Sequence, residues 1–144
     1  MKIRFVFVLA ALAGCSGVKS RVEEGLVQTV IDQKPAAGSF YEVIGIGACD
    51  PQLPTDTQRR ALARDAAIVK AQYELVSLVK GVTLEGGVTV SKALAADSLI
   101  EARVHASIKG AEVLKSEFTD DGGCVVTMRL PKKALESALR TGIP

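Results

Sequence analysis

Apolar and polar positions change period along the chain, and each period predicts a different element. Residues 40–46 are rich in aromatic and β-branched side chains that alternate between two faces, which predicts a β-strand. Residues 56–80 follow without a helix breaker, behind Thr55 and Gln58, which have the spacing of a capping box. Gly81 then occupies the place of a C-terminal cap. A strand followed by one long helix is therefore expected.

The apolar side chains of this helix form two stripes instead of one when they are placed at about 100° per residue. The larger stripe contains Ala61, Ala67, Ile68, Ala71, Leu75, Leu78 and Val79. The second stripe contains Leu62, Ala66, Val69, Tyr73 and Val76. We expect one stripe to cover a sheet. The second is covered either by the rest of the chain, such as its own N-terminal linker, or by another subunit, so it is a candidate oligomer face.

The segment after the helix predicts a further strand and a second helix. Residues 82–90 are typical of a strand that Gly86 and Gly87 interrupt with a bulge or bend. Residues 91–110 are ambiguous, because their apolar positions alternate as in a strand but also tolerate a helix. We favour a short helix over residues 97–107.

The C-terminal third predicts a β-hairpin and a final helix. Residues 111–118 and 123–130 flank the sequence Thr-Asp-Asp-Gly at 119–122, which strongly favours a turn. Pro131 can open a short helix that ends near Arg140. The predicted fold class is α+β, with a long helix packed on an antiparallel sheet of three to four strands and a short second and C-terminal helix.

The first fourteen residues have the order of a bacterial export signal. Lys2 and Arg4 precede an apolar run over residues 5–13, which at roughly ten residues falls well below the ~20 that a membrane-spanning helix needs. The run ends in Leu-Ala-Gly before Cys15, a sequence typical of lipoprotein cleavage between Gly14 and Cys15. An ordinary signal peptide with an accidental cysteine is the alternative. We expect Cys15 to become an acylated N-terminus.

These features predict three regions: a signal peptide over 1–14, a lipidated N-terminus and linker over 15–38, and an α+β domain over 39–144. Part of the linker would also suit a short amphipathic helix docked on the domain or on a neighbour. Ser16 follows the lipidated position, and the absence of aspartate there favours the outer membrane, on its periplasmic side.

The charge balance gives no sign of a nucleic-acid partner. Loss of Lys2 and Arg4 with the signal lowers the 18 basic residues to 16, against 16 acidic ones, so the mature chain is close to neutral. The chain has no Trp, two Tyr and four Phe, a composition that argues against a sugar cleft or a base-stacking platform.

Two cysteines remain after lipidation, and they form a candidate disulfide. Cys49 and Cys124 would enter an oxidising compartment, where they either bridge or stay apart as small buried side chains. Their spacing, with His105 as the single histidine, gives no recognisable zinc site, so neither a metal nor a cofactor is expected.

Other candidate chemistry has simpler explanations. Gly45 and Gly47 resemble the start of a dinucleotide-binding turn, but the third glycine is missing and a proline-containing loop precedes the helix. Close approach of a helix or strand explains them better. Asp120 and Asp121 suit their turn, and His105 has no sequence-local catalytic partner. The arginines of the long helix, Arg59, Arg60 and Arg64, indicate a solvated face or pairing across a subunit boundary. No enzyme activity is expected.

Four segments in order carry a resemblance: residues 41–48, residues 60–67, Glu74-Leu75 with residues 79–82, and residues 108–113. Together with Cys15 they resemble the FlgP-like family of small bacterial outer-membrane lipoproteins, whose best-studied flagellar member builds rings or discs around the motor, and the similar N-terminal domain of FlgT. Not every member of this family serves a flagellum. The likeness covers about residues 40–131. It implies an α+β domain that self-assembles at the periplasmic face of the outer membrane, with no catalytic residues.

The expected function is therefore structural: a homo-oligomer in an accessory ring of a flagellar motor, with other flagellar or envelope proteins as candidate partners. A monomeric lipoprotein that binds a periplasmic or cell-wall component is the alternative. A small-ligand binder with an apolar pocket between helix and sheet is a third hypothesis.

Overall fold

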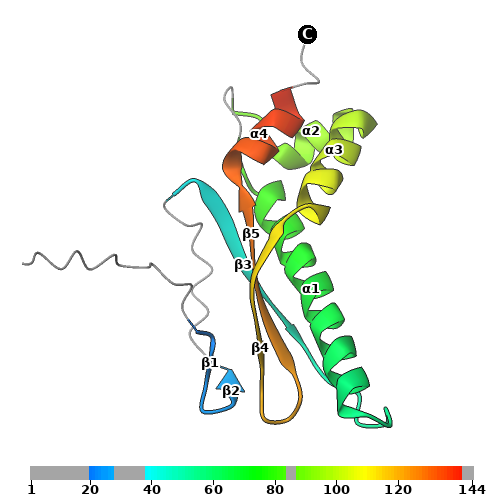
Figure 1. The fold of residues 1–144 in the computed structure, drawn as a ribbon. Coiled ribbons are helices and arrows are strands. Elements are labelled where there is room, and N and C mark those ends of the chain that lie inside the picture. Colours follow the sequence, from blue (N-terminus) through cyan, green and yellow to red (C-terminus); the bar gives the residue numbers. More distant parts are fainter. Residues whose placement is uncertain (1–19, 28–37, 84–86, 141–144) are drawn as a thin grey trace, which may run out of the picture.

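The computed structural model describes residues 20–27, 38–83 and 87–140 (Figure 1). In chain order the elements are β1 (Val22–Glu23), β2 (Leu26–Val27), β3 (Phe40–Gly47), α1 (Asp56–Lys80), α2 (Val90–Ala96), α3 (Ser98–Lys109), β4 (Glu112–Phe118), β5 (Cys124–Pro131) and α4 (Lys132–Arg140). The α+β prediction is confirmed, with α1 packed on a three-stranded antiparallel sheet.

The sheet has the order β3-β5-β4, so the last strand in sequence lies in the middle. Tyr41 pairs with Leu130 and Gly47 with Cys124 on one side of β5. On the other side β4 pairs in a register that shifts between Val113 and Lys115. Most residues of β5 are buried, and these include Val125 and Thr127 on the sheet face opposite α1.

Helix α1 has the predicted bounds and the predicted cap. The Thr55 hydroxyl accepts a hydrogen bond from the Gln58 N–H at 3.2 Å, and Gly81 is the C-cap with φ −77°, a right-handed conformation that does not require glycine. The buried face is an i, i+4 row that contains Ala63, Ala67, Ala71, Leu75 and Val79. The predicted larger stripe was wrong at its N-terminal end, because Ala61 is exposed and Ala63 is buried instead.

Small residues let α1 lie directly on the backbone of β3. A Cβ atom added at Gly45 would be 2.0 Å from the Ala67 carbonyl oxygen, and one added at Gly47 would be 2.1 Å from the Ala63 carbonyl oxygen. The sequence interpretation of these glycines as points of close approach is confirmed.

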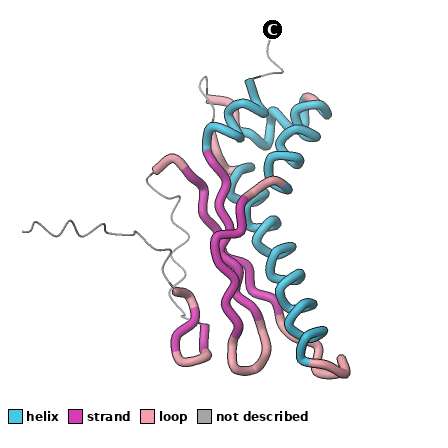
Figure 2. Tube along the Cα trace, viewed as in Figure 1, coloured by secondary structure: helices cyan, strands magenta, loops and turns pink. Residues whose placement is uncertain are grey.

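The short helices gather at the end of the sheet where α1 finishes (Figure 1). Helix α3 buries Ile100, Val104 and Ile108 in the main core, and α4 adds Leu135 and Leu139 to the same cluster. The helix predicted over residues 97–107 corresponds to α3, and the predicted C-terminal helix corresponds to α4. Helix α2 was not predicted. The tube view shows these helices around one end of the three long strands (Figure 2).

The strand predicted over residues 82–90 is wrong. The described part of this segment makes one isolated bridge, Thr83 with Thr89, and the Val90 N–H donates to the Val82 carbonyl at 2.9 Å. Gly87 has φ +78°, a left-handed backbone conformation that favours glycine. Thr89 then caps α2 by accepting from the Lys92 N–H, so a helix starts where a strand was expected.

Residues 20–27, expected within a linker, form a small hairpin of β1 and β2. Glu24 and Gly25 have φ of 50° and 74°, the left-handed conformations of a tight two-residue hairpin turn. The docked amphipathic helix considered for the linker does not form over these residues. The hairpin lies on the side of the sheet opposite α1 (Figure 1).

Candidate assembly surface and tether

The second stripe of α1 is exposed along most of its length. Leu62 is 45% exposed, Val69 53% and Tyr73 70%, and the smaller Ala66 is also exposed. Val76 differs, because it is half-buried against the main core. The structure therefore leaves four of the five stripe residues without a cover among the described residues.

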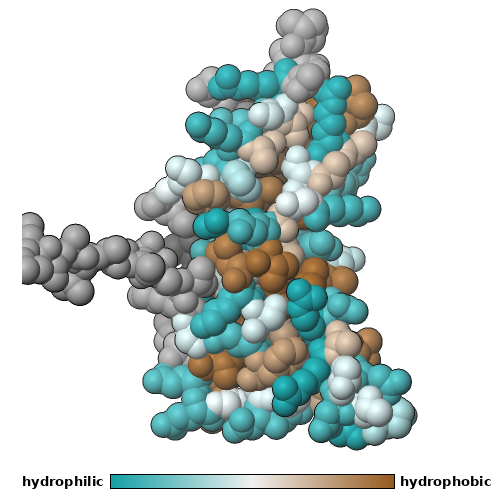
Figure 3. Space-filling view, in the orientation of Figure 1, coloured by the Kyte–Doolittle hydropathy of each residue, from teal (hydrophilic) through white to brown (hydrophobic). Residues whose placement is uncertain are grey.

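The exposed stripe faces away from the core. Successive helix residues turn by about 100°, so Ile68 and Ala66 point to opposite flanks of α1 around the buried Ala67. Ile68 packs against both core clusters, whereas Ala66 is exposed. The flank that carries Ala66 is thus the open one. In the space-filling view, apolar patches alternate with polar ones on the visible face (Figure 3).

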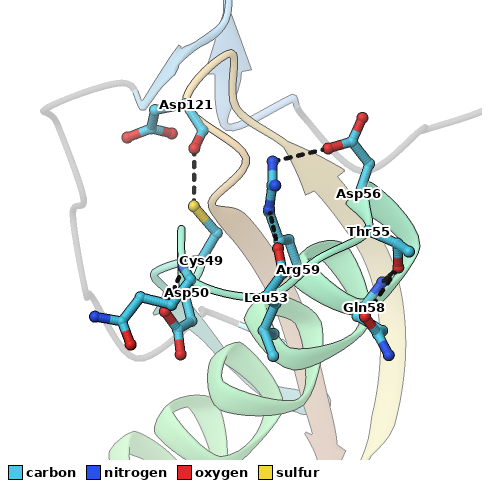
Figure 4. Close-up of polar contacts among 9 residues, drawn as sticks. Cys49, Asp50, Leu53, Thr55, Asp56, Gln58, Arg59 and Asp121 are labelled. Atoms are coloured by element: carbon cyan, nitrogen blue, oxygen red, sulfur yellow. Dashed lines mark hydrogen bonds and ion pairs between the residues drawn. The ribbon is translucent and has the colours of Figure 1, made fainter.

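Polar contacts fix the loop that leads into α1 (Figure 4). Arg59 donates through Nε to the Leu53 carbonyl at 2.8 Å and forms an ion pair with Asp56 at 3.0 Å. Arg60 places its guanidinium 5.3 Å from the centre of the Phe118 ring. Of the three arginines expected on a wet face, these two therefore contact their own chain.

The two internal cysteines are free thiols that lie near each other. Cys49 packs against the cluster that contains buried Cys124, and its Sγ donates to the Asp121 carbonyl at 3.0 Å (Figure 4). Gly47, the last residue of β3, pairs with Cys124, and Cys49 follows two residues later beside the β4–β5 turn, with its Sγ 3.3 Å from the place that a Cβ atom would take at Gly122. The disulfide stays a prediction.

Of the two aspartates in the β4–β5 turn, Asp121 has a structural role. The Asp121 carboxylate accepts from the Thr119 hydroxyl and from the Gly123 N–H at 3.2 Å. The hydrogen bond from Thr119 is the main cause of the lowered pKa of Asp121. His105 is exposed and lies 3.9 Å from Glu101 one turn away. Within the described ranges, no three His, Cys, Asp or Glu residues gather in a way that could hold a metal.

A contact that the sequence did not predict joins the N-terminal hairpin to β4. Glu117 accepts hydrogen bonds from the Ser20 hydroxyl and, at 2.8 Å, from the Arg21 N–H. Burial alone would raise the pKa of Glu117, but these bonds and Lys115 outweigh it, so the pKa is lowered. Arg21 also lies 3.5 Å from Glu42 on β3. The alternation of apolar and polar residues could not reveal this hairpin, because each of its two strands has only two residues.

The predicted cleavage and lipidation residues, Gly14 and Cys15, lie outside the described residues. No helix in the described part of the chain is both long enough and apolar enough to cross a membrane. Comparisons of the chain with protein-family models, with curated proteins and with solved structures found no match.

Proposed function

We propose that this protein is a lipid-anchored, non-enzymatic lipoprotein that self-assembles through α1 at the periplasmic face of the outer membrane. The anchor is Cys15, at the end of the export signal. Acyl chains on this residue would hold the domain at a membrane surface without a spanning helix.

The exposed stripe of α1 is the observation that carries the proposal. Large apolar side chains scattered singly over a surface need no explanation, but Leu62, Val69 and Tyr73 lie along one flank of one helix. They recur at helical spacing beside the small Ala66, so a second helix can pack closely against them. A second copy of this chain presents the same flank, and two copies could bury it mutually.

Charge introduced on this flank tests the assembly surface. We expect Val69→Glu to weaken self-association by at least about tenfold, because a carboxylate would be buried without a partner. Sedimentation of the unlipidated chain from Ser16 to Pro144 measures the change. Ala61→Glu is the matched control, since Ala61 is an exposed residue of the same helix outside the stripe. Equal association of both variants and the wild type would place the interface elsewhere.

Replacement of the lipidated residue tests the anchor. Cys15→Ser removes the thiol that carries the acyl chains, so the protein should move from the membrane fraction to the soluble periplasmic fraction. Fractionation of cells that express each form, followed by immunoblotting, measures this. Membrane retention of Cys15→Ser at the wild-type level would be incompatible with a lipid anchor at this residue.

The resemblance to FlgP-like lipoproteins supports a more particular role, in an accessory ring or disc of a flagellar motor. Deletion of the gene should then impair swimming in its own bacterium without loss of cell growth. A deletion strain that swims normally would remove the flagellar part of the proposal and leave the anchored assembly. A strict monomer would favour the binding of another envelope component.

A further inference from the structure

The N-terminal hairpin is held on the sheet by a set of specific contacts. We call residues 20–27 the strap. Ser20 and Arg21 donate to Glu117 on β4, and the Arg21 guanidinium reaches Glu42 on β3. At the other end of the strap, the Gly25 carbonyl accepts from the Asp120 N–H at 3.1 Å. The strap is thus attached to both outer strands and to the β4–β5 turn.

Arg21 crosses the middle strand of the sheet. Glu42 and Glu117 lie on the sheet face opposite α1, because their neighbours Tyr41, Val43 and Phe118 belong to the helix-side core. Strand β5 lies between β3 and β4, so a residue that contacts both glutamates spans β5. Two β5 residues on this face, Val125 and Thr127, are fully buried, and a third, Arg129, is half-buried.

The strap depends on the sheet for its own structure. An isolated two-stranded hairpin is at best marginally stable in water, and this one pairs only two residues on each strand. Gly25 also packs closely against the β4–β5 turn: a Cβ atom there would be 2.0 Å from Cγ of Asp120, and its φ is +74°. Docking therefore orders the hairpin, and release would return its residues to a flexible chain.

Docking of the strap decides how far the domain can stand from its lipid anchor. From Cys15 to Ser20 the chain has five residue steps, which span at most about 18 Å. With the strap released, the tether would run to Phe40, with a maximal length of about 90 Å and an average span of about 28 Å. Release of the strap therefore raises the maximal length of the tether about fivefold.

We propose that the strap is a clasp that shortens the tether and holds the sheet face opposite α1 toward the phospholipid headgroups. This inference rests on the proposed anchor at Cys15. It also fits the proposed assembly surface, because α1 lies on the far side of the sheet from the strap and its stripe stays open to neighbouring copies.

Neutron reflectometry on a supported phospholipid bilayer tests the clasp with the full acylated protein. The water gap between headgroups and protein should be below about 18 Å for the wild type. The double variant Arg21→Ala, Glu117→Gln should widen the gap toward about 28 Å. Glu101→Gln, a carboxylate-to-amide change at an exposed residue of α3, is the control and should keep the narrow gap. Equal gaps in wild type and double variant, or a wild-type gap above about 18 Å, would overturn the clasp.

Hydrogen exchange in the same samples separates failure of the clasp from failure of the anchor. The Asp120 amide, which donates to Gly25, should exchange on the order of tenfold faster in the double variant and be unchanged in Glu101→Gln. Unchanged exchange in the double variant would show that these contacts do not hold the strap and would refute the clasp. A wild-type chain that forms no layer on the bilayer would refute the anchor, and with it the short tether, even if the strap is docked.

Discussion

At the scale of single residues, contact between α1 and β3 depends on missing side chains. Gly45 and Gly47 have no Cβ, and the alanines above them have only a methyl group, so helix and strand backbones meet with little between them. A Cβ atom added at either glycine would clash with backbone atoms of α1, and no side-chain rotation could relieve that clash.

We therefore predict that Gly45→Ala destabilises the protein by about 3 kcal/mol, since its Cβ would lie 2.0 Å from the Ala67 carbonyl oxygen. Chemical denaturation measures the free energy of unfolding. Gly38→Ala is the matched control, because a Cβ there has no atom within 4 Å, and it should change stability by less than about 0.5 kcal/mol. Similar losses in the two variants would show that helix–strand contact is not the cause.

The two thiols should differ in reactivity. Cys124 is fully buried and burial raises its pKa, whereas Cys49 is partly exposed. Because the thiolate is the reactive form, we expect iodoacetamide to modify Cys49 in the folded, reduced protein and Cys124 only on unfolding. Mass spectrometry of timed samples follows both sites. Faster modification of Cys124 would contradict the burial described here.

The same mass measurement without reductant decides the candidate disulfide. Protein taken from the periplasm should be lighter by two hydrogen atoms and resist alkylation if Cys49 and Cys124 are bridged. Two free thiols in that sample would rule out the bridge.

At the scale of elements, helices and turns marked by a specific local sequence were predicted correctly, whereas segments identified by composition alone were not. The capping box of α1 and the Thr-Asp-Asp-Gly turn define their elements through contacts a few residues apart, so the sequence shows them directly. The strand prediction for residues 82–90 was wrong because it relied on their β-branched composition. In the structure, the described part of the segment forms a single bridge, and Thr89 caps helix α2. The strap was missed because it depends on Glu117, 96 residues beyond Arg21 in sequence.

More of the candidate assembly surface than of the strap could be predicted from the sequence. Helical period alone separated the exposed stripe from the buried one, and it erred only near Ala61 and Val76. Those errors arise because the i, i+4 row drifts around the helix by about 40° per step, so the buried face is not parallel to the axis.

Acid should loosen the strap. The lowered pKa of Glu117 means that its ionised form contributes stability above the ordinary pKa of a glutamate, and this is lost as the pH falls through the lowered value. Ser20, Arg21 and Lys115 face this carboxylate. Between pH 6 and about pH 3, the free energy of unfolding should fall more in the wild type than in Glu117→Gln, as measured by denaturation. Identical pH profiles would show that Glu117 does not stabilise the docked strap.

At the scale of the whole molecule, the two faces of the sheet have different tasks in this account. One face carries α1, whose outer flank is the proposed contact between copies. The other carries the strap, which leads back toward Cys15. The proposed anchor and the proposed assembly surface would therefore use opposite sides of one small domain, and membrane attachment would leave the α1 stripe uncovered.

Self-assembly is the central claim, and absolute mass in solution tests it most directly. Light scattering of the unlipidated chain from Ser16 to Pro144 over a range of concentrations should give a discrete multimer whose population rises with concentration. Val69→Glu should shift that rise to higher concentration. A wild-type mass that stays at one chain throughout the range would contradict assembly through α1 and would rank the monomeric binding protein first.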